Sequence, residues 1–152
     1  MTDTATQLQT GSYRLPSFDH ATVADAMHVG IFSCDAKTTP REAARTMSTR
    51  HIHCLVVGGL AHDRAGESLV WGLVSDLDLV RASIEADDDV TLAQCARGPI
   101  VSVEPKTPLR TAGELMLEHH VSHLIVTDPD TQAPLGLVSS LDIAGVFAWG
   151  EA

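Results

Sequence analysis

The stretch Gly72-Leu73-Val74-Ser75-Asp76-Leu77-Asp78 returns almost unchanged as Gly136-Leu137-Val138-Ser139-Ser140-Leu141-Asp142. Each copy joins a short apolar segment to the pattern Ser-x-x-Asp. A segment repeated within one chain indicates two similar units that are built to pack together. The repeat therefore predicts a pair of units related by a pseudo-twofold axis, with two related clefts.

The similarity continues upstream of both stretches, where the two halves align at a constant offset. The matching positions are Arg41, Ala43 and Met47 with Arg110, Ala112 and Met116, and the segment Leu55-Val56-Val57 with Leu124-Ile125-Val126. The first half has a longer connection between Val57 and Gly72, which contains Gly58, Gly59 and Gly66 and is expected to be a turn. The alignment thus covers most of the chain rather than one motif.

Each half predicts the element order β-α-β-β-α, preceded by a small helix, and the fold class is α+β. Proline near the start of each long helix fits this assignment, because its missing N–H has no intrahelical partner there. The expected elements are small helices at 23–27 and 92–96, strands near Ile31 and Ile100, helices at 40–50 and 108–119, strand pairs at 53–57 with 69–74 and 123–127 with 135–138, and helices from Asp76 and Ser140.

The predicted domain organisation follows from the repeat. Residues 1–17 are polar and are expected to form a flexible N-terminal tail. Residues 18–86 form the first unit and residues 87–152 the second, with the acidic segment Asp87-Asp88-Asp89 as the link between them. The two units together are expected to share one compact fold.

Charge and composition exclude several classes of partner. The chain of 152 residues has a formal net charge of −10, which disfavours binding to nucleic acid or to anionic lipid. No apolar run approaches the roughly 20 residues that span a bilayer, and no secretory signal is recognisable. The three cysteines, Cys34, Cys54 and Cys95, form no CxxC pair and are expected to be reduced. These features predict a cytoplasmic protein.

The Ser-x-x-Asp pattern, Ser75 with Asp78 and Ser139 with Asp142, has two interpretations. In a capping box, the serine hydroxyl accepts a hydrogen bond from a free backbone N–H and the acid three residues later reaches back. Alternatively, the free N–H groups at a helix start attract phosphate oxygens, and the carboxylate accepts hydrogen bonds from a ribose diol. The two interpretations do not exclude each other, because a cap can exchange partners when a ligand binds.

Over residues 20–148 the chain resembles a tandem pair of CBS domains, the nucleotide-sensing modules named after cystathionine β-synthase. The resemblance rests on the β-α-β-β-α order, on the two Gly-Leu-Val-Ser-x-Leu-Asp endings, and on Thr39-Pro40-Arg41-Glu42-Ala43-Ala44 with Thr107-Pro108-Leu109-Arg110-Thr111-Ala112. It implies two repeats packed through their sheets as a pseudo-twofold pair. It also implies two clefts that bind adenine nucleotides or S-adenosylmethionine.

The same resemblance implies roles for particular side chains in the two clefts. The aspartate of each ending is expected to hold the ribose hydroxyls and the serine to lie near phosphate. The base is expected beside the first strand, and the residues just before the second strand near the phosphates. The candidate ligand-binding residues are therefore Asp78, Asp142, Ser75, Ser139, Ile31, Ser33, Ile100, Ser102, His53 and His123.

Phosphate recognition is where this chain departs from the family pattern. Nucleotide binders of the family often carry His-Arg or Arg-Arg before the second strand, whereas this chain has His53-Cys54 and Ser122-His123. Histidine is only partly charged near pH 7. A weaker preference for polyphosphates, or for a less charged adenosyl ligand, is expected. Basic residues that could compensate are Arg50, Lys37, Lys106 and Arg97.

The histidines His51, His53, His119, His120 and His123 raise the alternative of a metal site. His119 and His123 have the spacing of two ligands on one helix face, but His123 is expected to begin a strand, so no metal is expected. No motif for catalysis is present, and an enzyme is not expected. No cofactor is expected either, and AMP, ADP, ATP or S-adenosylmethionine is the candidate regulatory ligand.

The resulting functional hypothesis is a stand-alone regulatory CBS-domain pair that binds an adenosine-containing ligand and signals occupancy to an unknown protein target by a conformational shift. A homodimer is expected from the resemblance, and the aromatic segment Phe147-Ala148-Trp149 suits an apolar dimer contact. The alternative is a ligand-free structural or interaction module in which the Ser-x-x-Asp patterns are only helix caps.

Overall fold

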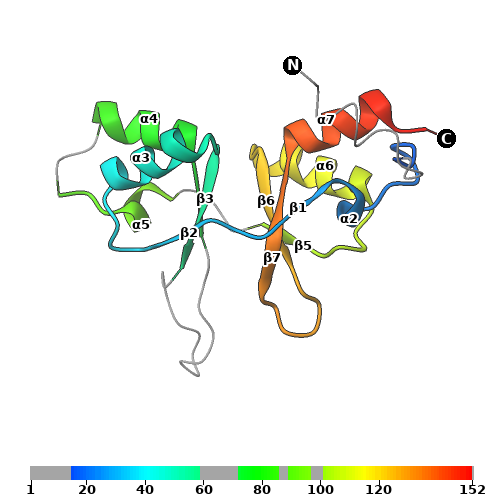
Figure 1. Cartoon of the computed structure of the whole chain (residues 1–152), viewed down its shortest axis with the longest axis horizontal. Helices are drawn as coiled ribbons and strands as arrows, with labels where there is room; N and C mark the ends of the chain where they lie inside the picture. The colour runs from blue at the N-terminus through cyan, green and yellow to red at the C-terminus, as the bar shows by residue number, and fades with distance from the viewer. Residues whose placement is uncertain (1–14, 59–71, 86–88, 97–100, 152) are drawn as a thin grey trace, which may run out of the picture.

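Two small β-sheets, one in each unit, lie next to one another at the centre of the molecule (Figure 1). The computed structural model describes residues 15–58, 72–85, 89–96 and 101–151. Ile100 and most of the predicted N-terminal tail lie outside these ranges, as do most of the longer turn after Val57 and part of the acidic link.

The first sheet has the order β2-β3-β4, and its helices are α3 and α4. Strand β2 runs parallel to β3, and β3 is antiparallel to β4. This arrangement is the β-α-β-β-α order predicted from the sequence. The elements are β2 (Ser33–Asp35), α3 (Pro40–Arg50), β3 (Cys54–Gly58), β4 (Gly72–Ser75) and α4 (Asp76–Glu85).

The second sheet has the order β1-β7-β6-β5 and repeats the first, with one additional strand at its edge. Strands β5 and β6 are parallel, and β6 and β7 are antiparallel. The repeated elements are β5 (Ser102–Val103), α6 (Leu109–His119), β6 (His123–Thr127), β7 (Pro134–Ser139) and α7 (Ser140–Trp149). The two-residue strand β1 (His28–Val29) was not predicted. It pairs with β7 through His28 opposite Leu137.

The chain reverses direction in the same way after both long helices. Helices α3 and α6 end at His51 and His120, each in the left-handed conformation with φ of 54°. The next strand, β3 or β6, then begins three residues after this histidine. The prediction that His119 and His123 share no helix face is confirmed, because α6 ends at His119 and β6 begins at His123.

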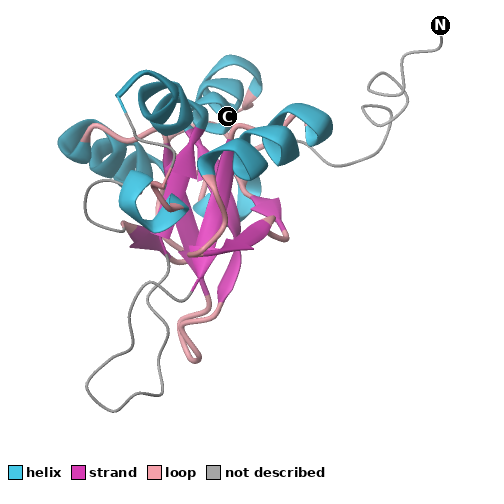
Figure 2. Cartoon of the chain, turned by 90° about the vertical axis from the view of Figure 1, so that its left-hand side faces the viewer, coloured by secondary structure: helices cyan, strands magenta, loops and turns pink. Residues whose placement is uncertain are grey.

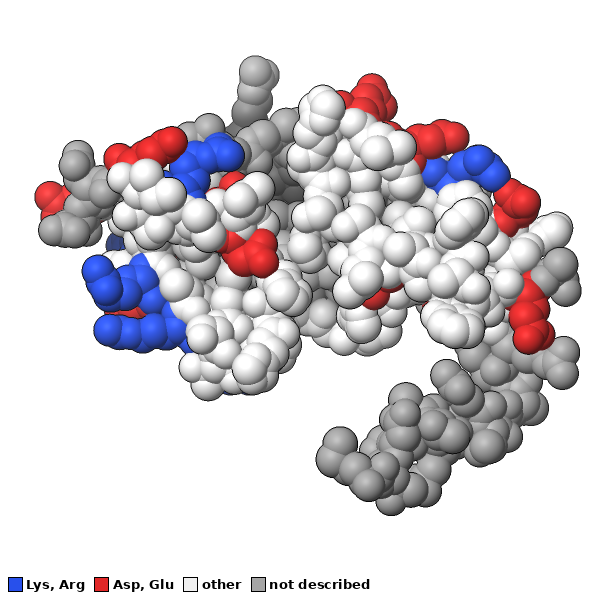
Figure 3. Space-filling model, turned by 90° about the horizontal axis from the view of Figure 1, so that it is seen from above, with Lys and Arg blue, Asp and Glu red and all other residues white. Residues whose placement is uncertain are grey.

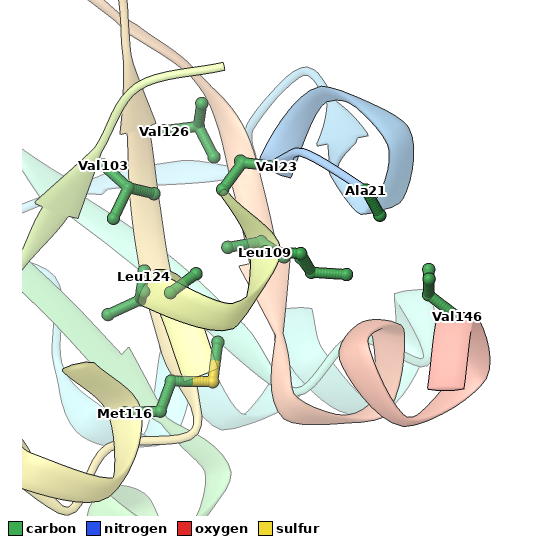
Figure 4. Close-up of a cluster of buried hydrophobic side chains, with 10 residues drawn as sticks. Ala21, Val23, Val103, Leu109, Met116, Leu124, Val126 and Val146 are labelled. Carbon is green, nitrogen blue, oxygen red and sulfur yellow. The ribbon is translucent and has the colours of Figure 1, made fainter. Parts of the chain in front are cut away.

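Each of the two small helices packs in the core of the other repeat: α2 belongs to the first repeat in sequence but packs in the second, and α5 does the reverse. Helix α2 (Val23–Ala26) buries Val23 in the core of the second unit, in one cluster with Leu109 and Val126 (Figure 4). The Val23 N–H donates to the carbonyl oxygen of Thr107 (2.8 Å). The segment before β2 therefore belongs physically to the second unit.

Helix α5 (Leu92–Cys95) makes the reciprocal exchange. Leu92 is fully buried in the core of the first unit, with Leu55, Val57 and Val74. Its N–H donates to the carbonyl oxygen of Thr38 (2.9 Å). The predicted positions of both small helices are confirmed to within one residue, but sequence repeats and packing units do not coincide.

The long helices α3, α4, α6 and α7 gather on one side of the sheets, which Figures 1 and 2 show from two directions. The buried face of each helix follows the helical period, as with Ala43 and Met47 in α3 and Ala112 and Met116 in α6. Among the described helices, none has the length and apolar character needed to cross a bilayer.

Candidate functional site

Both Ser-x-x-Asp patterns form capping boxes at the start of a helix. The Ser75 N–H donates to Asp78 Oδ2 (2.8 Å), and the Asp78 N–H donates to Ser75 Oγ (3.3 Å). The corresponding distances for Ser139 and Asp142 are 2.8 and 3.1 Å. Each serine hydroxyl also donates to the same Oδ2. The spacing thus places both carboxylates where a sheet ends and a helix begins, and fixes one oxygen of each.

Asp78 borders a hollow of about 310 Å³ between α4 and α5, which we call the Asp78 hollow. Its wall also contains the charged side chains of Arg81 and Glu85 and the amide of Gln94. Within the described part of the chain, Asp78 Oδ1 accepts no hydrogen bond, since the contacts of this carboxylate with Ser75 all involve Oδ2. This oxygen is therefore available to a hydroxyl group of a bound molecule.

Asp142 differs from Asp78 because its second oxygen already has a partner. His28 Nε2 lies 2.7 Å from Asp142 Oδ1, and the Asp142 side chain is only 13% exposed, whereas that of His28 is 77% exposed. The position of His28 is set by the pairing of β1 with β7. The backbone of His28 approaches the backbone of Gly136 closely. A Cβ atom added to Gly136 would lie 2.0 Å from the carbonyl oxygen of His28. The two halves of the repeat therefore present different carboxylates.

His53, just before β3, and His123, the first residue of β6, lie where the two units meet. His53 Nδ1 is 3.0 Å from Asp76 Oδ2 within the first unit. His123 of the second unit is within electrostatic range of Asp76 and His53 as well as Asp142. The structure thus brings both predicted histidines into one mixed cluster of imidazoles and carboxylates.

The residues predicted beside the base lie on the outer strands. Ser33 in β2 and Ser102 in β5 are exposed, and Ile31 is half-buried just before β2. The adjacent Phe32 ring is exposed, and the Arg50 guanidinium lies 4.9 Å from its centroid. Arg50 is one of the basic residues considered as compensation for the missing phosphate-binding pair, and the structure places its charge on an aromatic ring.

Sequence reasoning missed three polar residues of these sites, namely His28, Asp76 and Arg81. His28 stands 114 positions from Asp142, so no local spacing connects them. Asp76 lies in the repeated ending, but the second copy has Ser140 at this position, so a search for residues shared by both copies passes over it. Arg81 follows Asp78 by three residues on α4, a spacing that places two side chains on one helix face and could have identified it.

The histidine cluster has a consequence for stability against acid. Burial lowers the pKa of His123 from its ordinary 6.5, and the Asp76 and Asp142 carboxylates only partly oppose this effect. The unfolded chain then binds the proton more readily than the folded chain, so the free energy of unfolding falls as the pH drops below about 6.5. We expect His123→Gln to reduce this loss between pH 7.5 and 5.5, as measured by urea unfolding. An equal pH dependence in both proteins would contradict the prediction.

Comparison with known proteins identifies the family. Residues 23–85 and 92–148 each match the sequence profile of the CBS domain. The chain therefore belongs to the CBS-domain family, as its repeat and fold indicate. No curated protein sequence is significantly similar to it.

Solved structures with the same fold include a CBS-domain pair in complex with adenosine-containing molecules. The CBS domain pair of protein MJ0100, in complex with 5′-methylthioadenosine and S-adenosyl-L-methionine, is 20% identical with a TM-score of 0.70, over 84% of this chain and 99% of that one. A putative acetoin utilization protein from Vibrio cholerae is 20% identical, with a TM-score of 0.62 over 83% and 89% of the two chains.

A third similar structure is Hypoxic Response Protein I with two coordinated zinc ions. It is 26% identical, with a TM-score of 0.63 over 82% of this chain and 98% of that one. In the described part of the present chain, no group of three or more histidine, cysteine, aspartate or glutamate side chains is arranged to hold a metal ion. His53 and Asp76 form a hydrogen-bonded pair, with 3.0 Å between Nδ1 and Oδ2.

Proposed function

We propose that this chain is a regulatory CBS-domain pair that binds an adenosine-containing ligand, such as AMP, ADP, ATP or S-adenosylmethionine. The observation that carries this proposal is the Asp78 carboxylate, which is held at Oδ2 by its own cap and is open at Oδ1 beside the Asp78 hollow. An open oxygen on a carboxylate that is held in place suits a vicinal diol, because its two lone pairs can accept hydrogen bonds from both hydroxyls. Arg81 in the same wall supplies positive charge for an anionic group.

The proposed role of the ligand is to select one arrangement of the two units. The Asp78 hollow is lined by α4 of the first repeat and by α5 from the start of the second repeat. A ligand that contacts both segments stabilises the arrangement in which they are correctly spaced, in proportion to its differential affinity. A protein target that recognises this arrangement would respond to occupancy. The role is regulatory rather than catalytic, and the proposed assembly is a homodimer in the cytoplasm.

A specific observation favours the alternative of a scaffold without ligand. Both oxygens of Asp142 already have partners within the chain, Ser139 at Oδ2 and His28 at Oδ1, as expected for a carboxylate with a structural role. If Asp78 also serves only as a cap, both patterns are structural. The two hypotheses differ in one measurable property, which is whether any adenosine compound binds.

The experiment that decides between them is a thermal unfolding screen of the dialysed protein with AMP, ADP, ATP, S-adenosylmethionine, NAD and GTP. At 100 times its dissociation constant a ligand adds about 2.7 kcal/mol of stability, which raises the unfolding temperature measurably. A rise with adenosine compounds but not with GTP supports the sensor. The absence of any rise, confirmed by isothermal titration calorimetry, supports the scaffold.

Replacement of His28 tests whether this histidine prevents Asp142 Oδ1 from binding a ligand. A single hydrogen bond such as that between His28 and Asp142 contributes about 0.5–1.5 kcal/mol, so His28→Ala should strengthen binding beside Asp142 by up to about tenfold. Isothermal titration calorimetry of the Asp78→Ala,His28→Ala double variant isolates this site. His20→Ala, which removes another exposed histidine with a local partner, Ser17, is the control. Weaker binding without His28 would instead make this histidine a ligand contact.

A further inference from the structure

Helix α3 of the first unit has a basic outer surface. Arg41 and Arg45 are one helical turn apart, about 6 Å along the axis, on the side opposite to the buried Ala43 and Met47. Both arginines are exposed, as is Lys37 just before the helix. We call Lys37, Arg41 and Arg45 the α3 basic face. Figure 3 shows Lys and Arg side chains gathered at the outer end of the first unit, at its left.

This concentration of positive charge is unusual for the chain. The formal net charge is −10, yet four of the 10 lysines and arginines lie between positions 37 and 50. The neighbouring carboxylates Asp35 and Glu42 already accept hydrogen bonds from the backbone N–H groups of Lys37 and Thr39. Among the described residues, no side chain of the α3 basic face forms an ion pair. The described structure therefore leaves these charges without an opposite partner.

The second repeat differs at the equivalent positions. Arg110, the counterpart of Arg41, forms an ion pair with Asp19. Glu114 stands where the first repeat has Arg45. The unpaired positive face thus belongs to one repeat only, and the fold that both repeats share does not require it.

We propose that the α3 basic face is the docking surface for an acidic segment of the protein target. An arginine can bind a carboxylate through two parallel N–H···O hydrogen bonds, and here two arginines are presented one turn apart. Acidic residues four positions apart on a helix, or two positions apart on an extended segment, have a matching spacing of about 6–7 Å.

The charge of the whole chain favours a short acidic segment over a nucleic acid or a lipid surface. Attraction between exposed charges reaches about one Debye length, which is ~8 Å at physiological ionic strength. A short segment therefore interacts mainly with the face itself. An extended polyanion would also approach the rest of a chain whose net charge is −10, which is unfavourable.

The position of α3 connects the docking surface with the proposed ligand site. Helix α3 packs against α4 and α5, the two helices that line the Asp78 hollow. A ligand that changes the spacing of α4 and α5 therefore changes the packing of the docking helix. In naming the kind of target, this inference rests on the regulatory function proposed above, whereas docking itself requires no ligand.

Fluorescence anisotropy with a fluorescein-labelled peptide of six glutamates measures docking without ligand. In the Arg41→Gln,Arg45→Gln variant the dissociation constant should rise at least about tenfold, because two groups that form charge-assisted hydrogen bonds are lost. Lys106→Gln,Arg110→Gln changes the net charge equally in the second repeat and is the matched control, with an expected change below about twofold. Added sodium chloride should weaken binding to the wild type. Unchanged circular dichroism shows that both variants are folded.

Three results would overturn the docking surface. They are no binding of the peptide to the wild type at low ionic strength, equal weakening in the two double variants, and equal or tighter binding of a single-stranded DNA hexanucleotide or of phosphatidylserine vesicles. The last result would assign the face to another class of partner. The thermal unfolding screen with adenosine compounds is a separate measurement, so that failure of the sensor and failure of the docking surface give different results.

Discussion

Replacement of Asp78 by alanine should abolish the stabilisation by adenosine compounds that the sensor hypothesis predicts. The carboxylate is the proposed acceptor for the ribose hydroxyls, and a charge-assisted hydrogen bond contributes more than a neutral one. Without it, the gain of about 2.7 kcal/mol at a ligand concentration of 100 times the dissociation constant should disappear. The same substitution also removes the helix cap, which lowers the free energy of unfolding by about 1 kcal/mol without ligand.

The two effects of this substitution can be separated. Asp78→Asn keeps an oxygen for the cap but lacks the negative charge, so it should retain most of the stability and lose most of the binding. Asp19→Ala removes an exposed carboxylate outside both sites, which pairs with Arg110, and is the control. The sensor hypothesis predicts normal binding at the Asp78 hollow in this control. If Asp78→Ala only lowers stability and leaves ligand shifts intact, the carboxylate is a cap and the site lies elsewhere.

Replacement of Leu92 by alanine should destabilise the first unit, although Leu92 belongs to the second repeat. The side chain is fully buried against Leu55, Val57 and Val74. Truncation of a buried leucine costs about 2–5 kcal/mol, because apolar contact is lost and a cavity remains. Hydrogen exchange should therefore accelerate first at the amides of β3 and β4, rather than at those of β6 and β7.

Leu109→Ala provides the matched comparison for this prediction. Leu109 is equally buried, but in the core of the second unit, with Val23 from α2. Its truncation should accelerate exchange first at β6 and β7. If both substitutions accelerate exchange equally in both sheets, the two units unfold as a single cooperative body and the local effect is hidden. Exchange that accelerates first at β6 and β7 in Leu92→Ala would contradict the exchanged packing, because Leu92 would then stabilise its own repeat.

The elements of the fold were predictable because each has a strong local signal. Helix α3 begins at Pro40, with Thr39 and Glu42 as its capping box, and ends at Arg50 as the pattern indicated. The repeat then supplied a second test of every element. Strand β1 was missed because two residues, His28 and Val29, are too short for any periodicity.

The exchange of α2 and α5 was not predictable from the same signals. The sequence of a four-residue helix with one or two buried positions indicates that the helix packs against the protein core, but not which of the two cores it joins. Its destination is set by tertiary contacts, such as the hydrogen bond from Val23 to Thr107. In the same way the Ser-x-x-Asp caps follow from spacing, whereas the bond between His28 and Asp142 depends on strand pairing between distant segments.

The exchanged small helices make the chain equivalent to a domain-swapped dimer whose two members are covalently joined. Each repeat completes its neighbour's core, as Val23 does for one and Leu92 for the other. The covalent connection presents each helix to its acceptor at a high effective concentration. A single repeat separated from its neighbour would keep a donor helix without an acceptor and a core with one wall missing. The smallest independent folding unit of this protein is therefore the tandem, not the repeat.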